Sequence, residues 1–201
     1  MLRLPALASS LFLLLLQPAP QSAATASNAP AYTGDGNLLA PANYREWIYL
    51  TSGIDMSYIA QPAGAPPPAH STFDNVFVNP ESYRAFLATG TWPDKTIMVL
   101  EARSAENPVS INKRGHTQST EILGTEIHVK DRGTWAFYDL PANTTIATLI
   151  PRPAGCYTCH EAHGAVDTTF VQFYPTLFPL ARQKHTLSEE YLKETSSPTK
   201  P

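Results

Sequence analysis

The run Cys156-Tyr157-Thr158-Cys159-His160 constrains this chain more than any other stretch. Two thiols three positions apart can each add to a vinyl group of a haem, and the histidine that follows can present its imidazole to the iron. Cys156 and Cys159 are the only two cysteines of the chain, so none remains for a disulfide. The sequence therefore predicts one covalently attached c-type haem, with His160 as the axial iron ligand.

Two other chemistries use the same residue types. A redox-active Cys-x-x-Cys pair does not require a following histidine, and a zinc site needs two further ligands at matching spacing. Four other histidines, His70, His116, His128 and His185, show no ligand-like spacing. Both alternatives stay open, but the complete five-residue motif favours haem.

The N-terminus has the pattern of a secretory signal peptide. Arg3 precedes an apolar core over 11–16, and Ala24-Thr25-Ala26 is a small-residue cleavage site. The alternative is an uncleaved membrane anchor, although the apolar run is too short for a stable span. We expect residues 1–26 to be removed, which leaves a periplasmic or otherwise exported protein with no membrane span.

Length and charge indicate a single domain that does not bind nucleic acid. The chain has 201 residues, a length suited to one core of ordinary size. Its formal net charge is −3 and it has no basic stripe, so nucleic acid is not an expected partner. We predict a flexible leader over 27–34, a haem domain over 35–185 and a C-terminal tail over 186–201.

The order of the expected elements predicts an α+β fold. Strands are expected over 73–78, 96–103, 120–129 and 134–139, from β-branched residues and alternation. A helix should begin at Pro80, capped by Asn79, and run to Gly90. Proline-rich residues 61–70 and residues 104–119 read as loops. From Gly155 onward the pattern is helical, so the haem motif lies on a C-terminal helix behind the sheet.

Several motifs, taken in order, resemble the cytochrome P-460 family over roughly residues 35–184. They are Gly36-Asn37-Leu38-Leu39, Asn43-Tyr44-Arg45-Glu46-Trp47, Pro80-Glu81-Ser82-Tyr83, Gly133-Thr134-Trp135-Ala136-Phe137-Tyr138, the haem motif and Phe173-Tyr174-Pro175. The resemblance implies a mostly antiparallel sheet packed with helices, a homodimer and one c-type haem. It also implies a five-coordinate iron that takes His160 and leaves its other side open to small nitrogen ligands.

The family contains two functional kinds. Cytochromes P-460 oxidise hydroxylamine and carry a lysine bonded to the haem, whereas the related beta-type cytochromes c-prime lack this bond and bind nitric oxide. The cross-linking lysine directly precedes a glutamate, and the matching pair in this chain is Leu100-Glu101. Lys95 would lie on the opposite strand face, about 16 Å away, and Lys130 is on another expected strand. The resemblance is therefore nearer to the c-prime kind.

Further pocket residues follow from strand alternation. Met98 shares a face with Leu100, so it is either a sixth iron ligand or, as we favour, an adaptable packing residue. Phe73 is a candidate for an apolar distal cap or for ordinary sheet core. Asp74 falls where the resemblance places an arginine in hydroxylamine-oxidising members.

Glu126 and Asp131 are candidate proton acceptors for a pocket ligand, or else solvent-facing carboxylates. The leading functional prediction is an exported cytochrome that binds nitric oxide or a related small nitrogen ligand. The alternatives are a hydroxylamine-oxidising and nitric oxide-oxidising enzyme, and an electron-transfer cytochrome that works with a redox partner cytochrome.

Overall fold

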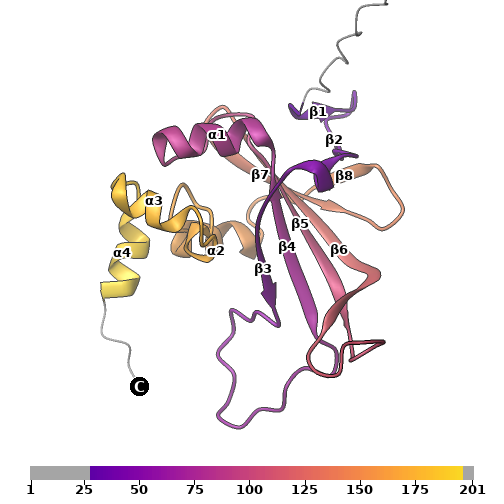
Figure 1. The fold of residues 1–201 in the computed structure, drawn as a ribbon. Helices are drawn as coiled ribbons and strands as arrows, with labels where there is room; N and C mark the ends of the chain where they lie inside the picture. The colour runs from indigo at the N-terminus through magenta and orange to yellow at the C-terminus, as the bar shows by residue number, and fades with distance from the viewer. Residues whose placement is uncertain (1–27, 197–201) are drawn as a thin grey trace, which may run out of the picture.

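Antiparallel pairing joins eight strands into one sheet, in the order β1-β2-β8-β7-β6-β5-β4-β3 (Figure 1). The computed structural model describes residues 28–196. The predicted signal peptide, residue 27 of the leader and residues 197–201 of the tail lie outside this range. The strands are β1 Ala31–Tyr32, β2 Leu38–Leu39, β3 Ile48–Ile54, β4 Thr72–Val78, β5 Ile97–Glu106, β6 Thr117–Asp131, β7 Thr134–Leu140 and β8 Ile146–Leu149.

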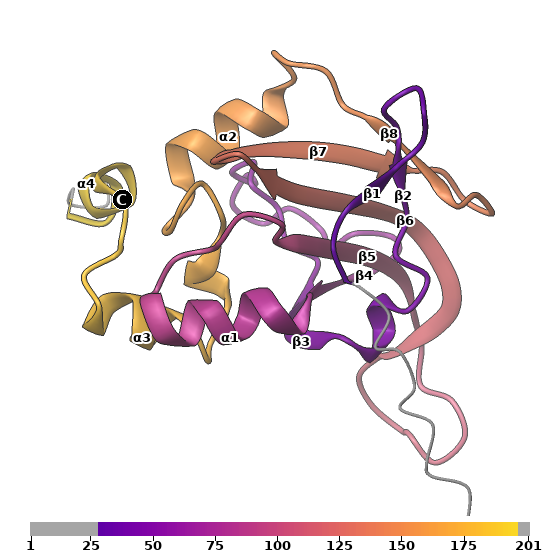
Figure 2. The ribbon, with the colours of Figure 1, turned by 90° about the horizontal axis from the view of Figure 1, so that it is seen from above.

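Four α-helices lie to one side of this sheet (Figures 1 and 2). They are α1 Pro80–Thr89, α2 Gly155–His163, α3 Phe178–Gln183 and α4 Glu189–Ser196, with the short 3₁₀ turns η1 Tyr44–Glu46 and η2 Val171–Phe173. One sheet with packed helices is the α+β fold that the sequence predicts. No helix within residues 28–196 is long and apolar enough to cross a membrane.

The sheet separates two apolar clusters, because successive strand residues face opposite sides. On the helix side, Met98 and Phe137 pack with Tyr157, Val171 and other residues of the C-terminal segments. On the far side, residues of the central strands pack against the N-terminal segment. This cluster comprises Leu38, Tyr44, Trp47, Ile97, Val99, Ile127, Val129, Tyr138 and Ala147. The C-terminal helices are thus held to the sheet by apolar burial.

The helix predicted after Asn79 is confirmed as α1. Pro80 occupies its first turn, where the missing N–H costs no hydrogen bond. The helix ends at Gly90, whose φ of 80° is a conformation that glycine adopts without a Cβ clash. Asn79 does not cap the helix with its side chain. Its Oδ1 instead accepts a hydrogen bond of 2.9 Å from the Ile97 amide, which ties the start of α1 to β5.

Other boundaries differ from the sequence expectations. The loop expected over 104–119 is shorter, because β5 continues to Glu106 and β6 begins at Thr117. Part of the expected leader forms β1, and part of the expected tail forms α4. In α4, the Tyr191 ring packs edge-on against Phe178, with the ring centroids 5.9 Å apart. This contact gives the charged helix an apolar anchor.

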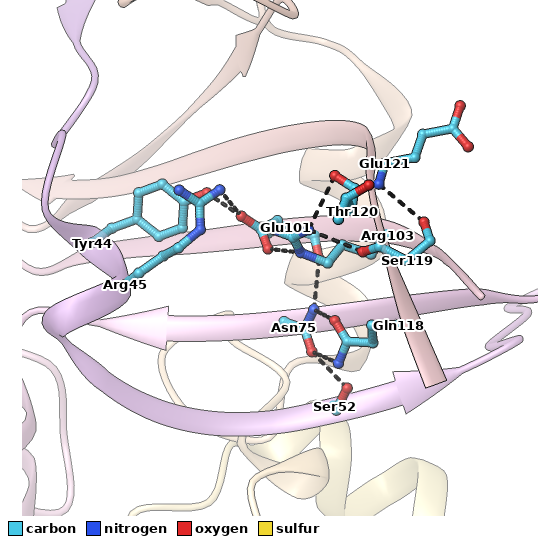
Figure 3. A network of polar contacts seen from close by, with 10 residues as sticks. All are labelled: Tyr44, Arg45, Ser52, Asn75, Glu101, Arg103, Gln118, Ser119, Thr120 and Glu121. Carbon is cyan, nitrogen blue, oxygen red and sulfur yellow. Dashed lines mark hydrogen bonds and ion pairs between the residues drawn. The ribbon is translucent and has the colours of Figure 1, made fainter. Parts of the chain in front are cut away.

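A buried carboxylate, Glu101, lies at the centre of a polar network on the far side of the sheet (Figure 3). The Tyr44 hydroxyl, Arg45 and Arg103 all donate to it. Burial alone would raise the pKa of Glu101, but the hydrogen bonds from Arg103, Tyr44 and Arg45 outweigh it and hold the pKa below its usual value. These three donors satisfy the hydrogen-bonding capacity of the buried Glu101 carboxylate, so the network stabilises the fold.

Next to this carboxylate, Asn75 and Gln118 exchange two hydrogen bonds of 2.7 and 2.9 Å, and Ser52 donates to Asn75 (Figure 3). These amide and hydroxyl contacts link β3, β4 and β6. They satisfy the polar groups of Asn75, which is 4% exposed.

Candidate functional site

A cavity of about 280 Å³ opens between the helix-side face of the sheet and the C-terminal segments. Strands β3–β6 supply its floor, and α2 with the stretch 169–174 supplies the opposite wall. Its lining is mostly apolar and comprises Thr51, Gly53, Met56, Tyr58, Asp74, Val76, Met98, Leu100, Glu126, His128, Cys156, Cys159, His160, Thr169, Phe170, Phe173 and Tyr174.

Cys156, Cys159 and His160 all line this cavity from α2, because the motif spans little more than one turn of that helix. Neither cysteine forms a disulfide. Within residues 28–196, no group of three or more histidine, cysteine, aspartate or glutamate side chains is arranged to hold a metal ion. Two thiols and one imidazole on a single short helix suit a metal that brings its own macrocycle.

The His160 imidazole has a defined orientation. Its Nδ1 lies 2.9 Å from the Thr168 carbonyl oxygen, so Nδ1 carries the proton and Nε2 keeps the lone pair. Burial lowers the pKa of His160 to about 4, and charge repulsion from His128 acts in the same direction. The ring packs on Phe170, with centroids 4.2 Å apart. A neutral, oriented imidazole is the form that binds a metal.

Met98 and Leu100 both line the cavity from β5, as alternation predicts. Met98 is 4% exposed, and the Tyr174 hydroxyl lies 4.0 Å from its sulfur. None of the described residues lining the cavity is a lysine. The Lys130 ammonium forms an ion pair with Asp167 and donates a hydrogen bond of 2.9 Å to the Trp92 carbonyl oxygen.

Two carboxylates, Asp74 and Glu126, also reach the cavity. Burial raises the pKa of Asp74, and the negative charge of Glu126 raises it further. Glu126 behaves in the opposite way. Its contact with His128, at 3.6 Å between Oε2 and Nε2, lowers the pKa of Glu126 by more than burial raises it. Glu126 is thus the better ionised of the two.

His128 is a cavity residue that the sequence analysis missed. Its ring stacks on Phe137, with centroids 3.9 Å apart, and meets His160 edge-on at 5.1 Å. It lies two positions after Glu126 on β6, so alternation alone places both residues on one face. That signal was present, but it becomes decisive only once the face carrying Glu126 is known.

Two candidates lie outside the cavity. Phe73 pairs with Arg103 across β4 and β5, on the face opposite Asp74, and does not line this cavity; a distal role for Phe73 stays a prediction. Asp131, at the end of β6, contacts Arg132 at 3.3 Å and does not line the cavity. Because alternation lets only one of two adjacent strand residues face a given side, Phe73 and Asp74 cannot both do so.

In a comparison with known protein families, the chain matches the model of the cytochrome P460 family over residues 41–171. The chain belongs to the cytochrome P460 family. The matched stretch contains β3–β8, α1 and all of α2, so it includes the Cys156–His160 motif and most of the cavity floor. No curated protein matches the chain.

Membership of the cytochrome P460 family makes haem the cofactor and small nitrogen compounds the ligand class. The residues that line the cavity fit this group. Two thiols and a neutral imidazole stand on one wall, and Val76, Met98 and Leu100 offer an apolar surface on the other. The family match ends before α3 and α4, which pack on the same side of the sheet.

Proposed function

We propose that this chain is an exported cytochrome that binds nitric oxide or a related small nitrogen ligand. One haem would be attached through Cys156 and Cys159, with His160 as its iron ligand, and the bound iron would supply the ligand-binding site. The chain's own contribution begins with His160, whose Nδ1 is committed to the Thr168 carbonyl oxygen and whose Nε2 is therefore available.

Leu100 is the observation that carries this proposal. It lines the cavity at the position where the resemblance expects the cross-linking lysine of hydroxylamine-oxidising members. A leucine has no nitrogen with which to bond a macrocycle, and Lys130 is engaged by Asp167 and the Trp92 carbonyl oxygen. An unmodified haem supports the nitric oxide-binding kind of protein.

The apolar side chains that line the sheet side of the cavity favour a neutral ligand. Val76, Met98 and Leu100 present apolar side chains from adjacent strands, which exclude water without offering hydrogen bonds to an anion. The Tyr174 hydroxyl contacts the Met98 sulfur, so Met98 packs against a partner within the protein. This contact favours the packing role of Met98 over that of a sixth iron ligand.

Hydroxylamine oxidation is a second candidate, and the pair of Glu126 and His128 is the observation that favours it. A substrate with N–H and O–H bonds must lose protons when it is oxidised, and Glu126 is an ionised carboxylate inside the cavity. Asp74 could take the same part only in its ionised form, which its raised pKa disfavours. A protein that only binds nitric oxide needs neither the Glu126 nor the Asp74 carboxylate as a proton acceptor.

The optical spectrum of the purified ferrous protein, recorded with and without nitric oxide, tests these candidates. We expect a high-spin c-type haem spectrum with a Soret band that shifts when nitric oxide is added. A strongly red-shifted Soret band before addition would reveal a modified macrocycle and support hydroxylamine oxidation. A low-spin, six-coordinate spectrum before addition would support electron transfer.

Export and assembly are part of the proposal. The N-terminal pattern supports cleavage after Ala26, and the family resemblance supports a homodimer. N-terminal sequencing of the mature protein tests the first point. Light scattering of the purified haem-containing protein tests the second.

A further inference from the structure

The segment from Gly164 to Thr169 connects the haem-motif helix to the cavity wall and supplies a hydrogen bond that orients His160. Thr168 gives that bond through its backbone carbonyl oxygen, at 2.9 Å from Nδ1. In metal sites, such an outer partner fixes the histidine tautomer and raises the basicity of the coordinating nitrogen. The position of one carbonyl group therefore affects the electron density that His160 can donate.

This segment has an unfavourable backbone conformation. Asp167 and Thr168 have φ values of 52° and 56°, in the left-handed region that residues with a Cβ rarely adopt. Consecutive non-glycine residues in this region persist only where the surrounding structure holds them. The Thr168 carbonyl thus needs an external constraint to keep pointing at His160.

Close packing provides one constraint. A Cβ atom added at Gly164 would lie 2.5 Å from the Thr168 carbonyl carbon and 2.7 Å from the His160 carbonyl oxygen. The segment therefore turns back directly onto the end of α2, with no room for a side chain at Gly164. This close approach brings Thr168 within reach of the imidazole.

A lysine from the sheet provides a second constraint. Lys130, near the end of β6, forms an ion pair with Asp167, the residue before Thr168. The Lys130 and Asp167 side chains are 13% and 27% exposed, so solvent screens the pair less than it screens a surface pair. The Lys130 ammonium also donates to the Trp92 carbonyl oxygen at 2.9 Å, which fixes its own position.

The other end of the segment is fixed by Trp92. Its indole Nε1 donates a hydrogen bond of 2.9 Å to the Thr169 hydroxyl, which in turn donates to the Val166 carbonyl oxygen at 2.7 Å. Trp92 is 2% exposed. The left-handed pair of residues is therefore held between Lys130 on one side and Trp92 on the other.

We propose that Lys130 and Asp167 are positioning residues that hold the Thr168 carbonyl against His160 and so set the strength of the iron–histidine bond. The inference rests on the proposed role of His160 as the iron ligand. It gives Lys130 a function that does not involve a bond to the haem. The series of contacts that connects the sheet to the iron site passes through Lys130, Asp167, Thr168 and His160.

Resonance Raman spectra of the ferrous haem-containing protein, with the reduction potential, test this proposal in Lys130→Met. Loss of the ion pair should loosen the Thr168 carbonyl, lower the iron–histidine stretching frequency and raise the reduction potential. Lys130→Arg should restore most of both values, because it retains the positive charge. Lys95→Met is the matched control, since it removes an exposed lysine whose backbone amide donates to the Lys130 carbonyl oxygen, and it should change neither value.

Each result decides the proposal. A folded Lys130→Met protein with an unchanged frequency and potential would overturn it, even if the melting temperature fell, since Lys130 would then be only structural. If Lys130→Met does not fold, the isosteric Asp167→Asn gives the same comparison. A missing iron–histidine band in the unaltered protein would overturn both this inference and the proposed role of His160. An iron–histidine band that is present but does not shift in Lys130→Met would overturn only the positioning role of Lys130 and Asp167.

Discussion

Leu100 on β5 pairs directly with Glu126 on β6, and both side chains line the same cavity. An aliphatic group and an ionised carboxylate are thus neighbours at the place where a small ligand would bind. The Leu100 side chain cannot form a covalent bond to the haem, whereas the Glu126 carboxylate is able to accept a proton. Separating these two properties by mutation distinguishes the two candidate functions.

Glu126→Gln should leave nitric oxide affinity within about threefold of the unaltered protein, since a neutral diatomic ligand needs no proton acceptor. Any hydroxylamine oxidation should fall by about 10²–10⁴-fold, the range typical for loss of a general base. Nitric oxide titration and steady-state turnover measure the two effects. Asp131→Asn removes a carboxylate from the same strand outside the cavity and serves as the control. Hydroxylamine turnover that survives the Glu126 substitution would show that Glu126 is not the base.

Replacement of both Cys156 and Cys159 by serine should abolish covalent haem attachment, because a hydroxyl does not form the thioether. Haem staining after denaturing electrophoresis should then be lost, while each single variant retains a weaker signal. Thr158→Ala changes an exposed residue inside the motif and should stain like the unaltered protein. Full staining of the double variant would mean that the haem is held by other residues.

Met98→Leu should change neither the spin state nor the coordination number of the ferrous protein, because Met98 packs against Tyr174. The similar volume of the two side chains should limit the loss of unfolding free energy to about 1.5 kcal/mol or less. Optical spectra and urea denaturation measure these quantities. Conversion of a low-spin spectrum into a high-spin one would instead identify Met98 as an iron ligand.

Glu101→Gln should lower the unfolding free energy by about 1–3 kcal/mol at neutral pH, because it weakens the bonds from Arg45, Arg103 and Tyr44. The folded-state pKa of Glu101 lies below its unfolded value, so this contribution is fully present above about pH 4.5 and is lost as the pH falls through the folded value. The difference between the two proteins should therefore shrink at about pH 3.

Urea denaturation at the two pH values measures the effect of Glu101→Gln. Glu121→Gln alters an exposed glutamate of β6 and should show no such difference. A gap between Glu101→Gln and the unaltered protein that stays constant with pH would contradict the role assigned to the ionised carboxylate.

The haem motif and the α+β order were predictable because both depend on local patterns. Cys156, Cys159 and His160 lie within little more than one helical turn, and α1 has a proline at its start and a glycine at its end. Local signals of this kind need no knowledge of which strands are neighbours.

The remaining cavity residues depend on register, which local patterns do not determine. His128 reaches the cavity because β6 pairs with β5 so that His128 lies opposite Met98. Phe73 and Asp74 alternate correctly, yet the sequence does not say which of their two faces meets the helices. The strand β3 and the helix α4 were missed because their positions are decided by tertiary packing.

Alternation along β5 separates two tasks within one short strand. Met98 and Leu100 face the cavity, whereas Val99 and Glu101 belong to the far side of the sheet. A change at position 100 can therefore redirect the chemistry of the site without disturbing the buried carboxylate that follows it. The two faces of such a strand can vary separately, so the ligand pocket and the polar network behind it are independently adjustable.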